Sequence, residues 1–168
     1  MKKTATVYWL IPSEPYHELF REIIRILARQ FDAPRFEPHL TLVATSQDSQ
    51  TAKRVLRQIK ARPIRLKIRE IACSSKFTKT LFVRVAPTKS LDRLIVDLAG
   101  ARKPLRDPHI SLIYKKIPRR TKQELASTIR LPVRGVVFDS IKTVRCPVPT
   151  NTRADVKAWR VIATKSLR

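Results

Sequence analysis

The chain has 168 residues, 43% of them hydrophobic, which suits a single domain over residues 1–168 with a buried core. Its 36 lysines and arginines against 13 acidic residues give a net charge of +23, which attracts phosphates and fits either a solubilising surface or a polyanion site. No apolar run approaches the roughly 20 residues of a membrane span, and two glycines argue against Walker and dinucleotide-binding loops.

The amino-terminal segment and the cysteines indicate a cytoplasmic protein. Met1-Lys2-Lys3-Thr4 has the charge of a signal peptide, but the apolar stretch Ala5–Ile11 is short and lacks a small-residue cleavage site. Cys73 and Cys146 belong to no CxxC or Cys/His ligand cluster, which argues against zinc and favours free thiols, although their pairing is left open. We expect a monomer without membrane contact, metal or cofactor.

The first part of the chain alternates strand and helix signals. Thr4–Ile11 is rich in β-branched and aromatic residues and predicts a strand, after which Ser13 is a candidate helix cap with Pro15 in the first turn. Apolar residues then recur at helical spacing until Ala33-Pro34 ends the pattern. The next predicted elements are a strand over His39–Thr45, a basic helix over Asp48–Ala61 and a half-buried strand over Ile64–Arg69.

The second part repeats this alternation. Thr88 is a candidate cap for a helix that ends at Gly100, and Thr121-x-x-Glu124 has the pattern of a capping box. The predicted strands are Thr80–Ala86, His109–Tyr114, Val133–Val144 and Val156–Thr164. Short helices interspersed among strands indicate the α+β class.

A doubled motif is the most informative feature of the sequence. Residues 37–43 read acidic, proline, histidine, aliphatic, hydroxyl, aliphatic, aliphatic, and residues 107–113 read the same at every position. Alternate residues of a strand share a face, so His39 should lie beside Thr41, and His109 beside Ser111. The residues Leu40, Leu42, Ile110 and Leu112 should then occupy the buried face.

Two such pairs, brought together, form a cradle for a phosphodiester. Imidazole titrates near neutrality, so one of His39 and His109 can activate water while the other protonates the leaving oxygen. The hydroxyls of Thr41 and Ser111 can donate hydrogen bonds to phosphoryl oxygens. The third histidine, His17, lacks the pattern.

The doubled His-x-Thr/Ser motif resembles the two-histidine (2H) phosphoesterases. Within them, the chain is similar to the plant cyclic phosphodiesterases, which open ADP-ribose 1″,2″-cyclic phosphate and nucleoside 2′,3′-cyclic phosphates. The resemblance runs nearly end to end, through Val7–Pro12, Pro34–Thr41, Pro108–Tyr114 and the tail from Cys146 through Asn151-Thr152 to Trp159.

This resemblance implies a two-lobed α+β fold with pseudo-two-fold symmetry, in which antiparallel sheets line a central cleft and helices lie outside. It implies that His39 and His109 act on the phosphate and that Thr41 and Ser111 hold its oxygens. Tyr114 would line the cleft, and Phe77 falls near the position of an aromatic residue that contacts the nucleoside base.

Two departures from the family leave the substrate open. The plant enzymes carry more cysteines, and the basic charge here is far stronger than the family requires. The leading hypothesis is a metal-independent hydrolase of small cyclic phosphates. The alternatives are an enzyme acting on RNA ends, as a 2′,3′-cyclic phosphodiesterase or a 2′-5′ ligase-like enzyme, and a non-catalytic RNA-binding protein.

Overall fold

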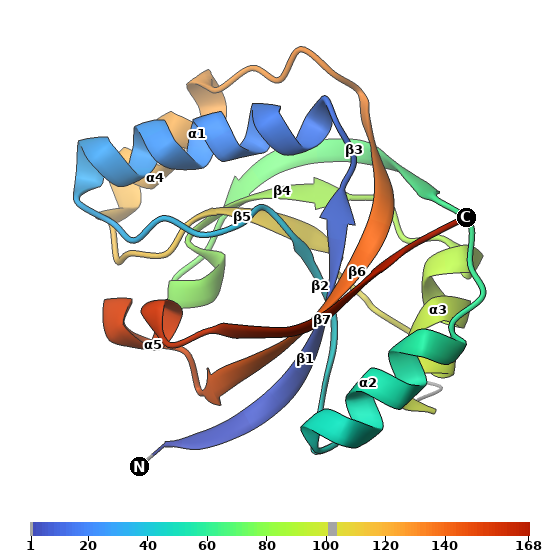
Figure 1. Ribbon diagram of the computed structural model, residues 1–168. Helices are drawn as coiled ribbons and strands as arrows, with labels where there is room; N and C mark the ends of the chain where they lie inside the picture. The colour runs from blue at the N-terminus through green and yellow to red at the C-terminus, as the bar shows by residue number, and fades with distance from the viewer. Residues whose placement is uncertain (1, 101–103) are drawn as a thin grey trace.

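The computed structural model describes residues 2–100 and 104–168 and has the mixed helix and strand content that the sequence predicts (Figure 1). The strands in these residues are β1 (Lys3–Pro12), β2 (Leu40–Thr45), β3 (Ile64–Cys73), β4 (Leu81–Val85), β5 (His109–Ile113), β6 (Gly135–Val148) and β7 (Arg160–Ser166). The helices are α1 (Tyr16–Phe31), α2 (Ser49–Gln58), α3 (Lys89–Ala99), α4 (Arg119–Thr128) and α5 (Arg153–Lys157), with a 3₁₀ turn η1 (Phe77–Lys79).

The strands form one antiparallel sheet whose order reflects an internal two-fold repeat. The order is β1-β2-β5-β4-β3-β6-β7, and β6 also pairs with β1, so hydrogen bonds connect six strands in a ring. The run β1-α1-β2-α2-β3 matches the run β4-α3-β5-α4-β6 element by element. Strands β2 and β5 meet at Leu40 and Ile110, which are equivalent positions of the two motifs. The pseudo-two-fold arrangement is therefore confirmed.

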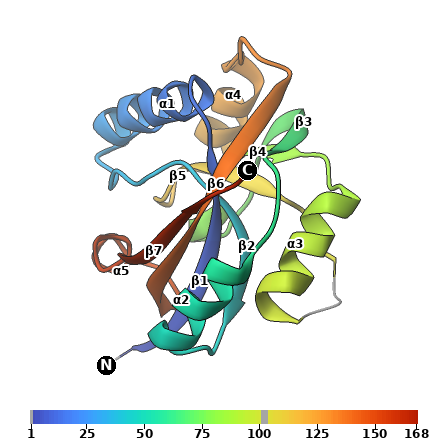
Figure 2. The ribbon, with the colours of Figure 1, turned by 45° about the vertical axis from the view of Figure 1, so that its right-hand side comes forward.

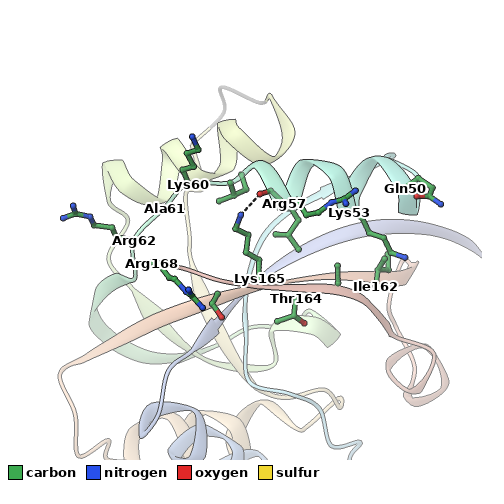
Figure 3. Close-up of a pocket in the computed structure, with 14 residues that line it drawn as sticks. Gln50, Lys53, Arg57, Lys60, Ala61, Arg62, Ile162, Thr164, Lys165 and Arg168 are labelled. Atoms are coloured by element: carbon green, nitrogen blue, oxygen red, sulfur yellow. Dashed lines mark hydrogen bonds between the residues drawn. The ribbon is translucent and has the colours of Figure 1, made fainter.

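The helices cover the outside of the sheet in two pairs. Helices α1 and α4 lie against β3, β4 and β5, whereas α2 and α3 lie against β2, β6 and β7 (Figures 1 and 2). Each of α1 and α3 follows a strand of one half and packs on the other half, which interlocks the two lobes. A wide groove of about 1180 Å³ runs between α2 and β7 (Figure 3).

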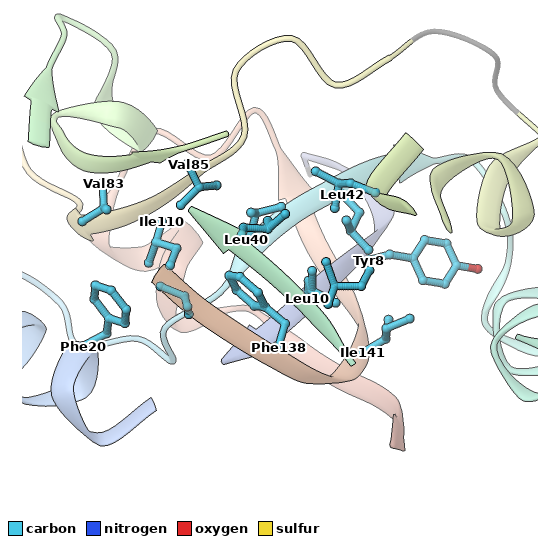
Figure 4. Close-up of a cluster of buried hydrophobic side chains, with 14 of the residues drawn as sticks. Tyr8, Leu10, Phe20, Leu40, Leu42, Val83, Val85, Ile110, Phe138 and Ile141 are labelled. Atoms are coloured by element: carbon cyan, nitrogen blue, oxygen red, sulfur yellow. The ribbon is translucent and has the colours of Figure 1, made fainter. Parts of the chain in front are cut away.

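The core lies between the sheet and the helices (Figure 4). The four aliphatic residues of the two motifs, Leu40, Leu42, Ile110 and Leu112, are at most 3% exposed, as the alternation predicts. Their burial is worth roughly 1.5–3 kcal/mol for each side chain. It also fixes the register of β2 and β5, because a slip by one residue would move all four into the cavity face. The core therefore determines where the motif's polar side chains point.

Three local predictions are wrong. Ser13 does not cap α1: the hydroxyl donates to the Val137 carbonyl (3.1 Å), and Pro15 occupies the cap position. Helix α4 begins at Arg119, so Thr121 lies within it and caps nothing.

The third correction concerns the predicted strand Val156–Thr164. Its first residues complete α5, and β7 begins only at Arg160. A capping box does occur here, because Thr152 accepts from the Asp155 amide and the Asp155 carboxylate accepts from the Thr152 amide. The reciprocal pair starts a helix where β-branched residues alone favoured a strand.

The predicted caps Asp48, Thr88 and Gly100 are confirmed. Asp48 accepts from the Thr51 amide (2.8 Å), and Thr88 accepts from the Leu91 amide (3.2 Å). Gly100 ends α3 with φ +66°, a left-handed conformation that glycine adopts without strain. Among the described residues, no helix combines the length and the apolar character needed to cross a bilayer.

Candidate active site

The two motifs meet at one cavity of about 290 Å³ on the face of the sheet opposite Leu40 and Ile110. His39 immediately precedes β2 and His109 begins β5, so the pairing of these strands brings the histidines to either side of the pseudo-two-fold axis. The cavity lining includes all four predicted polar side chains, His39, Thr41, His109 and Ser111.

Both imidazoles are held in the same way by the backbone. His39 Nδ1 lies 2.7 Å from the Glu37 carbonyl oxygen, and His109 Nδ1 lies 2.8 Å from the Asp107 carbonyl oxygen. A carbonyl can only accept, so each Nδ1 carries the proton and donates it. Each ring therefore keeps Nε2 as the nitrogen available to a bound molecule.

The acidic residues of the two motifs lie outside the cavity, where each pairs with cations. Both Glu37 carboxylate oxygens accept hydrogen bonds from Lys142 Nζ at 2.6 Å. Asp107 accepts from Arg84 Nε (2.7 Å) and is paired with Lys79. Burial acts to raise the pKa of Asp107, but these two cations outweigh it and lower that pKa. Neither carboxylate lines the cavity, so the negative charges are neutralised away from a phosphate.

An aromatic ring supports each histidine. Trp9 stacks on His39 with ring centroids 3.8 Å apart and planes 13° apart, and Phe82 meets His109 edge to face at 5.3 Å. Trp9 and Phe82 occupy equivalent positions, because Trp9 pairs with Thr41 in the ladder and Phe82 pairs with Ser111.

Matching β-bulges set these positions. The register of β1 and β2 shifts so that Leu42 is the extra residue, and the register of β4 and β5 shifts so that Leu112 is the extra residue. A bulge re-aims the following side chains, and here it adds Ala44, rather than Val43, to the cavity lining.

Burial governs the protonation of the pair. His39 is 4% exposed, and burial lowers its pKa to about 4, against an opposing effect of its hydrogen bond to the Glu37 carbonyl. Burial also lowers the pKa of His109. An anion between the rings favours the imidazolium form, so a bound phosphate would shift both values upward.

The two hydroxyls differ in their present partners. Ser111 is 4% exposed, and its Oγ donates to the Thr78 carbonyl at 2.7 Å. Thr41 is exposed at the cavity wall. Thr41 can thus donate to a phosphoryl oxygen directly, whereas the Ser111 hydroxyl must first rotate away from Thr78.

The aromatic residues predicted for the nucleoside side of the site separate in the structure. Tyr114 lines the cavity, and burial raises its pKa. Phe77 lies in η1 outside the lining, with its ring centroid 6.1 Å from that of Tyr114. Trp9 and Trp159, which the sequence did not predict as site residues, also line the cavity and meet edge to face at 5.1 Å.

The cysteines are both free thiols. Cys146 lines the cavity, and burial raises the pKa of its thiol to about 12, so it stays protonated at neutral pH. In the part of the chain that the structure describes, no group of three or more His, Cys, Asp or Glu side chains is placed to hold a metal ion.

Solved structures of other proteins that are distant in sequence share this fold. The chain superposes on E. coli LigT complexed with 3′-AMP with a TM-score of 0.58 at 12% identity, covering 98% of each chain. It superposes on the protein TT0787 of Thermus thermophilus with a TM-score of 0.57 at 17% identity, also covering 98% of each.

Sequence comparison assigns the family. The model of the cyclic phosphodiesterase-like protein family matches residues 4–167. A cyclic phosphodiesterase of Arabidopsis thaliana is 21% identical over 179 residues, covering 99% of this chain and 97% of the relative. The chain therefore belongs to the cyclic phosphodiesterase-like family of 2H phosphoesterases, which is a family of enzymes.

Proposed function

We propose that this enzyme hydrolyses cyclic phosphodiesters to phosphomonoesters without a metal ion, with His39 and His109 as its general acid and base. The observation that supports it best is the matched anchoring of the two rings, each of which donates Nδ1–H to a carbonyl and keeps Nε2 for the substrate. The substrates we propose are nucleoside 2′,3′-cyclic phosphates and ADP-ribose 1″,2″-cyclic phosphate.

The reaction is a displacement at phosphorus by water. One Nε2 accepts a proton from water as the water oxygen bonds to phosphorus. The other Nε2, protonated beforehand, donates its proton to the ester oxygen as the P–O bond of the ring breaks. The pair gains one proton and loses one, so exchange with solvent restores the starting state. The site thus requires one neutral and one charged imidazole.

The charge of the cavity suits a single phosphodiester. Among the described residues that line it there is no lysine or arginine, so the phosphate meets one imidazolium and the hydroxyls of Thr41 and Ser111. These groups match one negative charge. At about 290 Å³ the cavity lies at the small end of ligand pockets, which suits a cyclic phosphate and its ribose. The rings of Tyr114 and Trp159 offer apolar surface to an attached base.

The test is hydrolysis of 2′,3′-cyclic AMP and of ADP-ribose 1″,2″-cyclic phosphate in EDTA, with products identified by phosphorus NMR. We expect turnover that EDTA leaves unchanged. Complete loss in EDTA, restored by one divalent ion, would contradict the metal-free mechanism, and inactivity on both compounds would contradict the substrate class.

RNA ends are the second candidate substrate, for a 2′,3′-cyclic phosphodiesterase or a 2′-5′ ligase-like enzyme. The groove between α2 and β7 favours this alternative, because six of its lining residues are lysine or arginine. A short oligonucleotide ending in a 2′,3′-cyclic phosphate, assayed beside 2′,3′-cyclic AMP, separates the two substrates. A non-catalytic RNA-binding protein would have no use for two anchored imidazoles.

A further inference from the structure

The groove between α2 and β7, here named the basic groove, gathers positive charge away from the active site (Figure 3). It is formed by α2, residues 59–62 and β7, and its volume is about 1180 Å³. Its cationic residues are Lys53, Arg57, Lys60, Arg62, Lys165 and Arg168. Among the described residues, none of those that line it is an aspartate or a glutamate.

The charges of the basic groove are not neutralised within the described chain. Some cations elsewhere are paired, as Arg25 is with Glu22 and Lys142 is with Glu37. None of the six groove cations forms an ion pair with a carboxylate of the described residues. Five are exposed, and Lys165 Nζ donates to the Arg57 carbonyl at 2.5 Å. Like charges at this density repel one another, so an anion in the groove relieves that repulsion.

Strand β7, at the edge of the sheet, runs from the active cavity on one face to the basic groove on the helix-covered face, so an RNA chain joining the two would cross this edge. Trp159 lines the cavity, β7 begins at the next residue, and the groove lining starts at Ile162. At about 3.3 Å per strand residue, Ile162 lies roughly 10 Å from Trp159 along the chain, and Lys165 lies roughly 20 Å away. The exposed Arg160 lies between them. In the described residues β7 pairs with β6 alone and forms the edge of the sheet.

We propose that the basic groove binds the phosphodiester backbone of single-stranded RNA whose 3′ end occupies the active cavity. This inference rests on the proposed function, because a 2′,3′-cyclic phosphate at the end of an RNA chain would place further phosphates beyond the cavity. A concave row of cations fits a thread-like polyanion better than it fits a flat membrane surface. The groove is larger than a mononucleotide site needs.

The chemistry of the groove also predicts how the RNA is read. In the part of the chain that the structure describes, the groove is lined by no aromatic side chain on which a base could stack. The contacts are therefore to phosphates, and binding should depend on length and salt but not on sequence.

The experiment compares two triple variants, each of which removes three positive charges. The groove variant carries Lys53→Gln, Arg57→Gln and Lys60→Gln. The control carries Arg119→Gln, Arg120→Gln and Arg130→Gln, exposed residues on α4 and just after it, on the side of the sheet away from α2. A third protein, with Lys53→Arg and Lys60→Arg, keeps the charge.

The probes are 2′,3′-cyclic AMP and an oligouridylate of about twelve nucleotides with a 2′,3′-cyclic phosphate end, a length within the usual span of single-strand sites. Binding is measured by fluorescence anisotropy across a salt series, with an uncleavable 3′-phosphate end. Each phosphate contact contributes about 0.7 to the slope of log affinity against log salt, so the groove variant should show a slope shallower by about 2 and roughly 100-fold weaker binding at 0.1 M salt. The charge-conserving protein should bind like wild type.

The readouts separate this inference from the proposed function. All variants should hydrolyse 2′,3′-cyclic AMP at the wild-type rate, because none alters the cavity. Equal weakening by the groove and control variants would overturn the groove site, as would capture by phosphatidylserine vesicles without oligouridylate binding. If the protein binds RNA through the basic groove but hydrolyses neither probe, the result would support the groove as an RNA site and contradict the proposed hydrolysis.

Discussion

At the scale of single residues, the two imidazoles are held by carbonyl groups and not by carboxylates. A carboxylate on Nδ1 stabilises the imidazolium, as in the serine protease triad. A neutral carbonyl orients the ring with a weaker preference for the charged form. The protonation of His39 and His109 is therefore governed mainly by their burial and by a bound anion.

The histidines give the first prediction. His39→Ala and His109→Ala should each lower kcat on 2′,3′-cyclic AMP by about 100-fold or more, because a general acid or base typically contributes 10²–10⁴-fold. The matched control is His17→Ala, which removes the histidine of α1 that contacts Glu37 outside the cavity. Steady-state kinetics of the three proteins decide the point. Wild-type turnover by either cavity variant would rule out the mechanism.

The hydroxyls give the second prediction. Thr41→Ala and Ser111→Ala should lower kcat/KM, because each removes a donor to a phosphoryl oxygen, a contact that can be worth a few kcal/mol in the transition state. Ser111→Ala should also lower the free energy of unfolding by about 1 kcal/mol, since its hydroxyl bonds the Thr78 carbonyl. Thr41→Ser keeps the donor and should stay active. Full activity in both alanine variants would make the hydroxyls structural.

At the scale of elements, the sequence predicted the position of the motif residues better than that of the other residues around the cavity. The motif itself places His39, Thr41, His109 and Ser111 on one face of two strands, because the period of a strand is local. Strand register, two β-bulges and the turn after α5 place Trp9 and Trp159 in the cavity lining and Phe82 against His109. Cross-strand register depends on the partner strand, so no local pattern in the chain could have identified these three residues.

Helix α5 yields the third prediction, which also concerns how the cavity wall is positioned. Thr152→Ala removes the cap of α5 and should cost about 1 kcal/mol of stability. Because α5 is followed closely by Trp159 in the cavity lining, the same change should raise KM for 2′,3′-cyclic AMP. Thr88→Ala removes the cap of α3, whose residues do not line the cavity, and should cost similar stability with KM unchanged.

Chemical denaturation measures the stability of both cap variants, and kinetics measures their KM. Together they show whether α5 positions Trp159 specifically or whether lost stability alone raises KM. A rise in KM of the same size in Thr88→Ala would show that lost stability alone accounts for the effect. Thr121→Ala completes the set, because Thr121 lies inside α4 and caps nothing. It should leave stability within about 0.5 kcal/mol of wild type, as surface changes usually do.

At the scale of the whole molecule, the candidate active site lies where the two halves of the chain meet. Each half contributes one motif, and α1 and α3 each pack across to the other half. The cavity between the halves therefore exists only in the complete fold. Burying titratable rings at this junction makes the stability of the whole molecule depend on their protonation.

The fourth prediction is the sign and range of that dependence. Burial lowers the pKa of His39 from 6.5 to about 4, so below pH 6.5 the unfolded chain binds a proton that the folded chain refuses. The free energy of unfolding should therefore fall as the pH drops from about 6.5 to about 4, by up to about 1.4 kcal/mol per pH unit and about 3 kcal/mol in total for this ring. The lowered pKa of His109 adds to the fall.

Urea unfolding at several pH values measures this for wild type and His39→Gln. The variant cannot titrate at this position, so its stability should fall less over the same range even if it is less stable at neutral pH. Asp155→Asn is the control, because the hydrogen bond from Lys2 lowers the pKa of Asp155 from 3.8 to about 2 and places its contribution below pH 4. Asp155→Asn should leave the slope of the free energy of unfolding against pH unchanged between pH 4 and 6.5. An unaltered slope in His39→Gln would show that His39 is readily protonated in the fold, because the buried ring would then gain its proton as easily as in the unfolded chain.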